Sequence, residues 1–590
     1  MVMEPIPDVN REAEFLALLS EIDRALRGGD TLGASALAFN ALEFAPEHSG
    51  LLNLAAYKLI QNDELDQARI LLERARHIAP NDANILNSLG NVLRLEGEIL
   101  EARRAFDAAM ELDHTNLQIV FNRARLLEDL SENEAARAGY NRVLIARPGD
   151  VDCLTRLFHL AISENNYAEA ERLGDLAIQD QSLGSVAGRL CRIAIERADY
   201  VTARNYGERA LAREQGAAAA IGLAQAEYLS GDTDLARKRL EDVFTGSGLE
   251  ALDRAIAHGL LGDIEHRAEN YESAYSHYAE CKRLLAKLYS REFSAIGSES
   301  YVDAISRLRA NFESMPPELW TSAPPSEEDF ESPVKAHAFL VGFPRSGTTL
   351  LEQVLAGHPN IQTMDEVDAL SDSLTGYLED PDGLRRLAHT SNQSLAKMRS
   401  SYWRKCRAAT PRLNGSYFVD KMPLNSALLP CIAKIFPSAR IIFAIRDPRD
   451  VAFSCFRTRF TMTPAMYEFC SVEGAARLYD AVMSSFELYR SRLWLPVFEA
   501  QYSDLVGDLE SAARRLCQFL GVAFESSMLA VADRAKSMRI STPSAGQVAR
   551  GLYDGTGSWR PYRSYMTPIL PVLAPWVERY GFSDDESHFP

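Results

Sequence analysis

The order of hydrophobic and polar residues divides the chain into two regions with different periods. Through residues 15–285, apolar positions recur every three to four residues, as in residues 83–93 and 101–110, which is typical of amphipathic helices. From about residue 335 the apolar residues form short runs separated by helical segments. These runs are residues 337–341, 417–419, 440–445 and 495–502. This alternation predicts a mostly parallel sheet covered on both faces, so we expect an all-α region followed by an α/β domain.

The helical region repeats itself about every 34 residues. One set of equivalent positions is Ala34, Ala68, Ala102, Ala136 and Ala170, continued by Ala203 and Ala236 at intervals of 33. A second set is Pro46, Pro80, His114 and Pro148, and a third is Ala56, Gly90, Ala124 and Phe158. Two helices of about 12–14 residues and two short turns use roughly 34 residues, and small side chains let paired helices approach closely. We therefore expect stacked helix pairs.

This period resembles the tetratricopeptide repeat over roughly residues 15–285, with a last, shifted copy at residues 270–274. The resemblance implies a superhelix whose concave face binds a peptide or a partner protein. The residues themselves identify no ligand for that face. The alternative is a generic helical bundle in which the alanines are spaced by chance.

Composition and charge support a division into separate domains. Proline, serine and acidic residues are concentrated in residues 315–334, which indicates a connector. We expect helical repeats over residues 15–290, a connector over 291–334 and the α/β domain over 335–590. Residues 1–330 contain 55 acidic and 34 basic residues, whereas residues 331–590 contain 27 and 29. The strongly acidic first part would repel phosphate groups, so we expect no nucleic-acid partner.

Cysteine usage and the first residues bear on the compartment. The eight cysteines form no paired CxxC pattern, which suits a reducing compartment and suggests neither a zinc site nor a disulfide framework. Residues 1–8 have neither the basic nor the apolar part of a signal peptide, and no apolar run reaches the length of a membrane span. We expect a cytoplasmic protein without a membrane span.

The first predicted strand leads into the loop Gly342-Phe-Pro-Arg-Ser-Gly-Thr-Thr349. Its glycines allow backbone N–H groups to converge on an anion at the start of the next helix, as in a P-loop, and its threonines add hydroxyl donors. Nucleotide triphosphatases have a lysine where this chain has Thr348, so the clamp on the outer phosphates is missing. Arg345 provides a guanidinium instead. The loop therefore fits a nucleotide with one 5′-phosphate and one transferable anionic group.

A second anion site is predicted about a hundred residues later, in residues 440–454. An apolar strand there ends at Arg446, and a helix begins near Asp447 and Pro448. Ser454 follows Arg446 by eight residues, about two helical turns, so we expect its hydroxyl beside the guanidinium. Taken alone, this segment is also compatible with a surface turn that holds a salt bridge.

These two segments together resemble the donor site of sulfotransferases, most closely that of the tyrosylprotein sulfotransferases. The resemblance implies that the donor is 3′-phosphoadenosine-5′-phosphosulfate (PAPS). Its 5′-phosphosulfate would then be bound by Arg345, Ser346, Gly347, Thr348 and Thr349. Arg446 and Ser454 would bind its 3′-phosphate.

The resemblance extends to further positions. It implies Glu366 as the catalytic base, Lys421 as the group that neutralises the bridging oxygen, and Tyr502 as an aromatic residue near the adenosine. It also implies a late segment that closes over the nucleotide, in which Trp559 stacks on adenine and Arg550 and Arg560 add positive charge. Asp365 and Asp368 compete with Glu366 for the role of base. Asp368 also stands where the tyrosine-modifying enzymes have an arginine, which puts that acceptor in doubt.

The sequence thus predicts an enzyme, a PAPS-dependent sulfotransferase that modifies an acceptor hydroxyl and uses its repeats to recruit the acceptor or a partner protein. This scheme requires no metal. A protein tyrosine is the first candidate acceptor, but tyrosine segments in the family are acidic and suit an acidic repeat region poorly, so carbohydrate and small-molecule acceptors stay open. One alternative is a repeat-based binding scaffold with an inactive, nucleotide-sensing α/β domain. Another is a small-nucleotide kinase, with Asp420 or Asp447 completing a magnesium site.

Overall fold

The structure is a computed structural model. It describes residues 9–62, 64–130, 132–164, 166–179, 184–196, 199–214, 216–245, 249–294, 299–320, 332–380, 382–410, 413, 417–531, 534 and 555–582. The chain divides into two compact units, residues 1–187 and residues 188–590. Within the described residues, no helix combines the length and the apolar character needed to cross a membrane.

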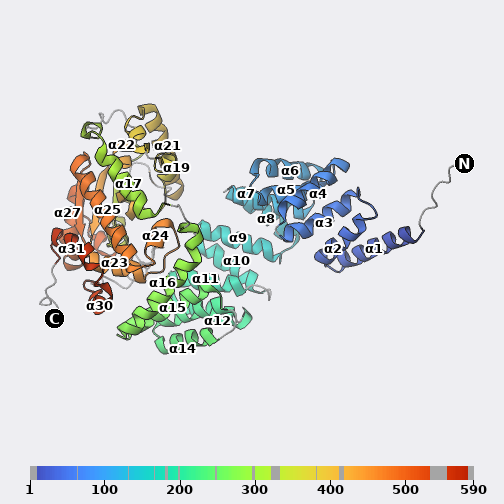
Figure 1. Ribbon diagram of the computed structural model, residues 1–590, viewed down its shortest axis with the longest axis horizontal. Helices are drawn as coiled ribbons and strands as arrows, with labels where there is room; N and C mark the ends of the chain where they lie inside the picture. Colours follow the sequence, from blue (N-terminus) through green and yellow to red (C-terminus); the bar gives the residue numbers. More distant parts are fainter. Residues whose placement is uncertain are drawn as a thin grey trace. The chain divides into compact units, whose positions relative to one another are not determined.

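The first unit consists of antiparallel helix pairs that follow one another along the chain (Figure 1). Its helices are α1 (Val9–Arg27), α2 (Thr31–Leu42), α3 (Ser49–Gln61), α4 (Leu65–Ile78), α5 (Ala83–Leu95), α6 (Ile99–Leu112), α7 (Leu117–Asp129), α8 (Asn133–Ala146), α9 (Val151–Ser163) and α10 (Tyr167–Gln179), and α11 (Gly184–Glu196) crosses the boundary between the units. Helices α5, α7 and α9, each the first helix of a pair, start 34 residues apart. Asp82, Asn116 and Asp150 cap these helices through a side-chain oxygen, which fixes where each helix begins.

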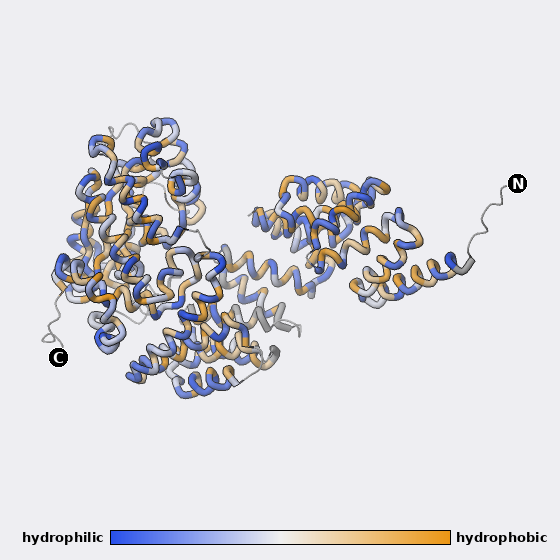
Figure 2. The backbone as a smooth tube through the Cα atoms, in the orientation of Figure 1, coloured by the Kyte–Doolittle hydropathy of each residue, from blue (hydrophilic) through white to orange (hydrophobic). Residues whose placement is uncertain are grey.

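The predicted close approach of the paired helices is confirmed. All seven alanines of the 34-residue set are fully buried. Gly90 lies against the ring of Phe106, where an added Cβ atom would come within 2.9 Å of the ring. Apolar and polar residues alternate along these helices (Figure 2), so each helix turns one face toward its neighbours. The predicted all-α region of tetratricopeptide type is therefore present.

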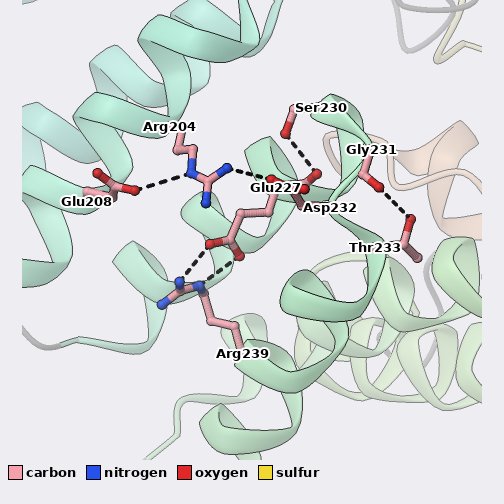
Figure 3. Close-up of polar contacts among 8 residues, drawn as sticks. All are labelled: Arg204, Glu208, Glu227, Ser230, Gly231, Asp232, Thr233 and Arg239. Atoms are coloured by element: carbon pink, nitrogen blue, oxygen red, sulfur yellow. Dashed lines mark hydrogen bonds and ion pairs between the residues drawn. The ribbon is translucent and has the colours of Figure 1, made fainter.

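Ion pairs also join successive helix pairs, in a pattern with the same period. Each ion pair links an arginine on the second helix of one helix pair to an acidic residue in or just after the last turn of the first helix of the next pair. They are Arg69–Glu96, Arg103–Glu132 and Arg137–Glu164 in the first unit, and Arg204–Asp232 and Arg237–Glu265 in the second. Figure 3 shows Arg204 between Glu208 and Asp232, beside the buried Glu227, which binds both ends of the Arg239 guanidinium.

The second unit contains the last helix pairs and the α/β part. Its helices are α12 (Tyr200–Glu214), α13 (Ala217–Ser230), α14 (Thr233–Thr245), α15 (Ala251–Arg267), α16 (Tyr271–Phe293), α17 (Tyr301–Ser314), α18 (Thr348–Ala356), α19 (Ser371–Leu374), α20 (Gly383–Ala388), α21 (Asn392–Ala409), α22 (Leu429–Ile435), α23 (Pro448–Arg457), α24 (Pro464–Glu468), α25 (Val472–Arg492), α26 (Tyr502–Gly507), α27 (Leu509–Leu520), α30 (Arg563–Met566) and α31 (Leu570–Arg579). Short 3₁₀ helices are η1 (Pro317–Leu319), η3 (Pro423–Leu428), η4 (Ser526–Leu529) and η5 (Arg560–Tyr562).

Helix α17 lies inside the stretch that was expected to be a connector, residues 291–334. Its apolar residues Ile305, Leu308 and Phe312 are buried in the core of the α/β part, where α17 packs against α25. The described portion of this stretch is therefore more than a linker.

Five strands form one sheet in the order β2-β3-β1-β4-β5, and all neighbouring strands are parallel. They are β1 (Ala336–Gly342), β2 (Ile361–Asp365), β3 (Tyr417–Lys421), β4 (Arg440–Ile445) and β5 (Val497–Gln501). The four apolar runs predicted as strands are confirmed. The edge strand β2 was not predicted, because only Ile361 and Met364 of its five residues are buried and its pattern is too polar to stand out.

The sheet separates two hydrophobic cores, as expected for a parallel sheet covered on both faces. Along β1, Phe339 and Val341 point into one core, which is shared with α17, α21, α22, α25 and α31. Ala338 and Leu340 point into the other core, which is formed with α18 and α27. Because side chains alternate along a strand, β1, β2, β3 and β4 each contribute buried residues to both cores.

Candidate active site

A residue predicted to act on the substrates stands at or just beyond the carboxyl end of each of the five strands. Strand β1 leads into the loop that carries Arg345, and β2 ends directly before Glu366. Strand β3 ends at Lys421, β4 ends before Arg446, and β5 ends before Tyr502. Since the strands are parallel, these residues meet at one edge of the sheet, which is where open α/β sheets bind ligands.

The loop between β1 and α18 depends on two glycines. A Cβ atom on Gly342 would lie 2.7 Å from the carbonyl oxygen of Ala444 in β4. Gly347 caps α18 with a φ of 95°, and a Cβ atom there would lie 2.6 Å from the ring of Tyr502. Arg345 also has a positive φ, of 71°. The chain thus turns sharply and leaves the first N–H groups of α18 available for an anion.

The hydroxyl-bearing residues of the loop lie in the first turn around this position. Thr348 and Thr349 are the first two residues of α18, and both line a cavity described below. Ser346 is buried, and its N–H donates to the carbonyl oxygen of Phe343. The structure thus brings all the loop residues predicted to bind the 5′-phosphosulfate to one turn.

Two arginines lie beside the loop. Arg345 Nε donates to Ser454 Oγ at 3.0 Å, so the hydroxyl of Ser454 is bound to Arg345, whereas the sequence placed it beside Arg446. Arg446 donates to the carbonyl oxygens of Arg345, at 3.3 Å, and Gly555, at 2.5 Å, and its guanidinium lies 4.6 Å from the ring centre of Tyr502. Arg446 Nε is buried and has no hydrogen-bond partner among the described residues. Arg345, Arg446 and Ser454 thus lie together, and we call them the cationic cluster.

Lys421 lies on the other side of the loop, among three carboxylates. Its side chain is fully buried, and its Nζ lies 2.9 Å from Glu366 Oε1 and 3.4 Å from Glu352 Oε2, and pairs with Asp365 Oδ1. Burial alone would lower the pKa of Lys421, but the three carboxylates raise it above its usual range. Lys421 is therefore a firmly charged ammonium group.

Glu352 is the most buried of the three acids. Burial raises its pKa to about 7, although the nearby ammonium of Lys421 acts in the opposite direction. Glu352 Oε2 has no hydrogen bond among the described residues. When Glu352 is protonated, the cluster holds two negative charges, on Asp365 and Glu366, and not three. This explains how three acidic residues can surround one lysine.

The two acids considered for a magnesium site have other partners. Asp420 precedes Lys421 on β3, so its side chain points to the opposite face of the sheet, where it accepts a hydrogen bond from Tyr402. Burial raises the pKa of Asp420 to about 7. Asp447 caps α23 and accepts from the backbone N–H and the guanidinium of Arg449. Asp368 accepts a hydrogen bond of 3.0 Å from the N–H of Ser371, the first residue of α19, and is not among the three acids that pair with Lys421.

The predicted late segment is held by one buried carboxylate. Asp450 accepts hydrogen bonds from the N–H of Gly557, at 2.7 Å, the hydroxyl of Ser558, at 2.9 Å, and the N–H of Trp559, at 3.0 Å. These contacts fasten the segment to α23, next to the Gly555 carbonyl that binds Arg446. Arg560 follows as the first residue of η5. Arg550 lies outside the described residues.

Trp559 does not occupy the position expected for stacking on adenine. Its ring is 2% exposed and belongs to the hydrophobic core. The guanidinium groups of Arg449 and Arg563 lie 4.7 Å and 5.8 Å from the ring centre. The resemblance of the late segment implied stacking on adenine, whereas in the structure the N–H of Trp559 donates to Asp450 and the ring is buried.

A cavity opens between the loop and Glu366. One side is polar and is formed by the loop residues Arg345, Gly347, Thr348 and Thr349 together with Glu366. The other side is apolar and consists of Pro344, Met422, Pro423, Leu424, Phe460 and Met466. We call Phe460 and Met466, with Met422 and Leu424, the apolar wall. A group bound here would touch the anion loop, a carboxylate and a hydrophobic surface at once.

Comparison with known proteins identifies this part of the chain. Residues 338–526 match the model of the sulfotransferase family. The α/β part is a sulfotransferase domain. A protein of Aquifex aeolicus (strain VF5) without an assigned function is 26% identical over 270 residues, covering 42% of this chain and 34% of that protein. A protein-tyrosine sulfotransferase of Drosophila melanogaster is 24% identical over 203 residues, covering 32% of this chain and 39% of that enzyme.

The chain spans only about a third of the first relative and two fifths of the second. Among solved structures, a tetratricopeptide repeat protein of Parabacteroides merdae ATCC 43184 is 23% identical with a TM-score of 0.32, over 40% of this chain and 93% of that one.

Several residues of the sulfotransferase domain were missed in the sequence. Glu352 follows Thr348 by four residues, one helical turn, so its position beside the loop was open to inference. Asp450 lies in the segment that was singled out, but nothing in the sequence pairs it with residues a hundred positions later. The apolar wall is assembled from separate segments and has no signature in the sequence.

Replacing Glu352 by glutamine should change how stability depends on pH. Folding raises the pKa of Glu352 from 4.5 to about 7, so between these values the folded chain keeps a proton that the unfolded chain has lost. Wild-type stability is therefore lost as pH rises through this window, and Glu352→Gln removes the loss. Relative to wild type, we expect the variant to gain up to roughly 3 kcal/mol between about pH 5 and pH 8, visible in thermal melts as several degrees.

The matched control is Glu578→Gln, the same substitution at an exposed position of α31. Its melting temperature should follow that of wild type at every pH. A difference between Glu352→Gln and wild type that is constant from pH 5 to pH 8 would contradict the raised pKa.

Proposed function

We propose that this protein transfers a sulfuryl group from PAPS to the hydroxyl group of an acceptor. The observation that carries the proposal is the pairing of Lys421 Nζ with Glu366 Oε1, at 2.9 Å, beside an anion-binding loop that contains Arg345. Glu366 lines the cavity, where an acceptor can reach it, while Lys421 lies behind it. A base and a cation next to an anion loop are the groups that sulfuryl transfer requires.

The cationic cluster fits the two anionic ends of the donor. The N–H groups at the start of α18, the hydroxyl of Thr348 and the Arg345 guanidinium would hold the 5′-phosphosulfate. Arg446, whose buried Nε lacks a partner among the described residues, would hold the 3′-phosphate together with Ser454. Burial, with the charges of Arg457 and Arg446, lowers the pKa of Arg345, and a bound anion would relieve this strain on the cation.

The remaining residues perform the transfer. Glu366 takes the proton of the acceptor hydroxyl as that oxygen forms a new bond to sulfur and the bond from sulfur to the bridging phosphate oxygen breaks. Lys421 then neutralises the negative charge left on the phosphate oxygen, which makes 3′-phosphoadenosine-5′-phosphate the leaving group. To do so, Lys421 must exchange part of its contact with Asp365 and Glu366 for the donor.

The apolar wall favours an acceptor whose hydroxyl is attached to a hydrophobic group. Met422, Leu424, Phe460 and Met466 offer few hydrogen bonds to a sugar but would pack well against an aromatic ring. A protein tyrosine is therefore our first candidate, in keeping with the protein-tyrosine sulfotransferases among the relatives. Asp368, which stands where those enzymes have an arginine, is exposed and accepts a hydrogen bond from the N–H of Ser371.

We further propose that the helix pairs of the first unit recruit an anionic segment of the acceptor or of a partner protein. Residues 1–187 contain 31 acidic and 17 basic residues, yet Arg94, Arg125 and Arg156 lie close together on α5, α7 and α9. Burial, then the charges of Arg94 and Arg156, lower the pKa of Arg125. Arg125 Nε is buried without a partner among the described residues, whereas Arg94 and Arg156 have acidic neighbours. An acidic segment thus finds a binding surface here despite the overall charge.

A single assay separates the proposal from its alternatives. Cell extract or synthetic tyrosine peptides are incubated with the protein and donor that carries radiolabelled sulfate. Transfer of the label supports the enzyme, and the labelled molecule identifies the acceptor. Nucleotide binding without transfer would support the scaffold, and transfer of phosphate from ATP would support the kinase, which the absence of a lysine at position 348 already disfavours.

Lys421→Met should lower turnover by at least about a hundredfold, because it removes the cation that pairs with Glu352, Asp365 and Glu366. The affinity for 3′-phosphoadenosine-5′-phosphate, measured by calorimetry, should change little, which also shows that the variant is folded. Lys397→Met, at an exposed position of α21, is the control. Wild-type turnover in Lys421→Met would refute the assigned role.

Arg446→Gln should weaken binding of 3′-phosphoadenosine-5′-phosphate by about 10- to 100-fold, since a charged contact to phosphate is worth roughly 1.5–3 kcal/mol. Binding of adenosine 5′-phosphate, which lacks the 3′-phosphate, should be affected much less. Calorimetry with both nucleotides measures the difference. An equal loss for the two ligands would place Arg446 elsewhere, and Arg477→Gln, at an exposed site on α25, should alter neither affinity.

Arg125→Glu should weaken binding of a peptide in which one tyrosine is flanked by glutamates by about tenfold, because the substitution puts a negative charge between Arg94 and Arg156. A peptide with serines in place of the glutamates should bind weakly to both proteins. Fluorescence anisotropy at two salt concentrations measures the affinity of each protein for each peptide. Arg104→Glu, on the exposed face of α6, is the control, and equal binding by the two variants would rule out this surface.

A further inference from the structure

The helix pair α15 and α16 packs directly on the sulfotransferase domain within the second unit. Helix α16 contacts α23, α24 and η5, and in Figure 1 it runs beside α24. The Tyr275 ring stacks on Tyr565 with ring centres 3.8 Å apart, and Tyr278 packs edge-on against Phe453. His266 Nδ1 lies 2.8 Å from the hydroxyl of Tyr562. Through these contacts the hydrophobic core of the domain extends into the last helix pair. The pair is therefore part of the domain's packing as well as a repeat.

Lys282 of α16 is the most unusual residue of this contact. Its side chain is almost completely buried, with 1% exposed, and burial lowers its pKa. Its Nζ donates a hydrogen bond of 2.7 Å to the carbonyl oxygen of Thr458, the residue that follows α23. No carboxylate pairs with Lys282 among the described residues. Burying an ammonium group is costly, so this lysine is kept at an energetic cost for a contact to the backbone of one segment.

The next residue of that segment is fixed by the same helix pair. Arg459 Nη2 pairs with Asp263 Oδ2 of α15 at 2.8 Å, and Asp263 Oδ1 accepts a hydrogen bond of 3.0 Å from Tyr278 of α16. Gly259 leaves room for the Arg459 side chain, since a Cβ atom there would lie 2.6 Å from Arg459 Cδ. Two consecutive residues, Thr458 and Arg459, are thus each bound by a polar group of the helix pair.

Further contacts with α16 lie close in sequence to Phe460 and Met466, the two residues of the apolar wall in this segment. Met462 and Cys470 pack with Cys281 and Leu285, and the hydroxyl of Tyr467 donates to the carbonyl oxygen of Ala286 at 3.2 Å. Between these anchored residues stand Phe460 and Met466, which line the cavity beside the anion loop. Residues 458–470 are therefore held at several points by α15 and α16, while two of their side chains form half of the apolar wall.

We infer that α15 and α16 position the acceptor side of the active site, with Lys282 as the main positioning residue through its bond to Thr458. The inference rests on the proposed function, because the apolar wall is taken to contact the acceptor. Lys282 touches neither substrate. Its loss should let residues 458–466 move, so that Phe460 and Met466 pack less well against the acceptor, while the donor side around Arg345 and Arg446 is preserved.

The test compares Lys282→Met with Lys287→Met. Methionine has a similar length and no charge, so it fits a buried site, and Lys287 is an exposed lysine of the same helix. In Lys282→Met we expect the KM for the acceptor to rise about tenfold, with kcat nearly unchanged and the Kd for 3′-phosphoadenosine-5′-phosphate within about twofold of wild type. Lys287→Met should match wild type in all three.

Hydrogen exchange gives a readout that does not depend on activity. In Lys282→Met the amides of residues 459–468 should exchange faster, while those of α18 and β1 keep wild-type rates. If wild type transfers no sulfate to any acceptor, the proposed function fails, but the exchange comparison still decides whether Lys282 holds this segment. Unchanged exchange and unchanged acceptor KM in a folded Lys282→Met protein would overturn the inference, as would equal weakening of donor and acceptor.

A second variant covers the case in which Lys282→Met does not fold. Asp263→Asn keeps an acceptor for the Tyr278 hydroxyl but removes the charge that pairs with Arg459. It should raise the acceptor KM by a few-fold and accelerate exchange in the same segment. Wild-type values for both in Asp263→Asn would count against positioning by this helix pair.

Discussion

All five strands of the sheet run in the same direction, and the arrangement of the active site depends on this constraint. Parallel strands with crossover helices bring every strand end to one edge, so single residues from five distant parts of the chain become neighbours there. The strand order β2-β3-β1-β4-β5 then determines which of these residues are neighbours. The anion loop follows the central strand, the acids and Lys421 come from β2, β3 and α18 on one side, and Arg446 comes from β4 on the other.

This order also separates charges of opposite sign. On the β4 side, Arg345 and Arg446 lie together, since Arg446 donates to the carbonyl oxygen of Arg345. On the β3 side, Lys421 is surrounded by three acids, of which Glu352 can keep its proton. A donor bound between the two sides would have phosphate groups near the arginines and its reacting end near Lys421 and Glu366. Under the proposed function, such binding would redistribute the ion pairs of Lys421 and so connect donor binding to release of Glu366 as the base.

Local patterns predicted much of this architecture, and non-local contacts account for what they missed. The regular spacing of the alanines, the loop of residues 342–349 and the apolar strand before Arg446 can each be recognised from the sequence without knowledge of the fold, so the sequence revealed them. Strand β2 escaped notice because an edge strand needs little hydrophobicity. The bond between Arg345 and Ser454 and the burial of Trp559 were not predicted, since they depend on contacts between residues that are distant in sequence. Spacing along the chain cannot identify such contacts before the fold is known.

The boundary between the helical repeats and the sulfotransferase domain also could not be located from sequence spacing alone. The alanine period runs through Ala236, and a reader of the sequence extends the repeats to the following helices, yet α12 to α16 group with the sulfotransferase domain in one compact unit. Beyond this packing, α15 and α16 bind the segment after α23 through two polar groups, the buried Lys282 and the partly buried Asp263. A helix pair that only stacks on its neighbours has no use for a buried lysine, whereas one that must fix a neighbouring loop does. A hydrogen bond to one carbonyl group fixes both the distance and the direction of the loop backbone, which the packing of apolar side chains alone specifies less sharply.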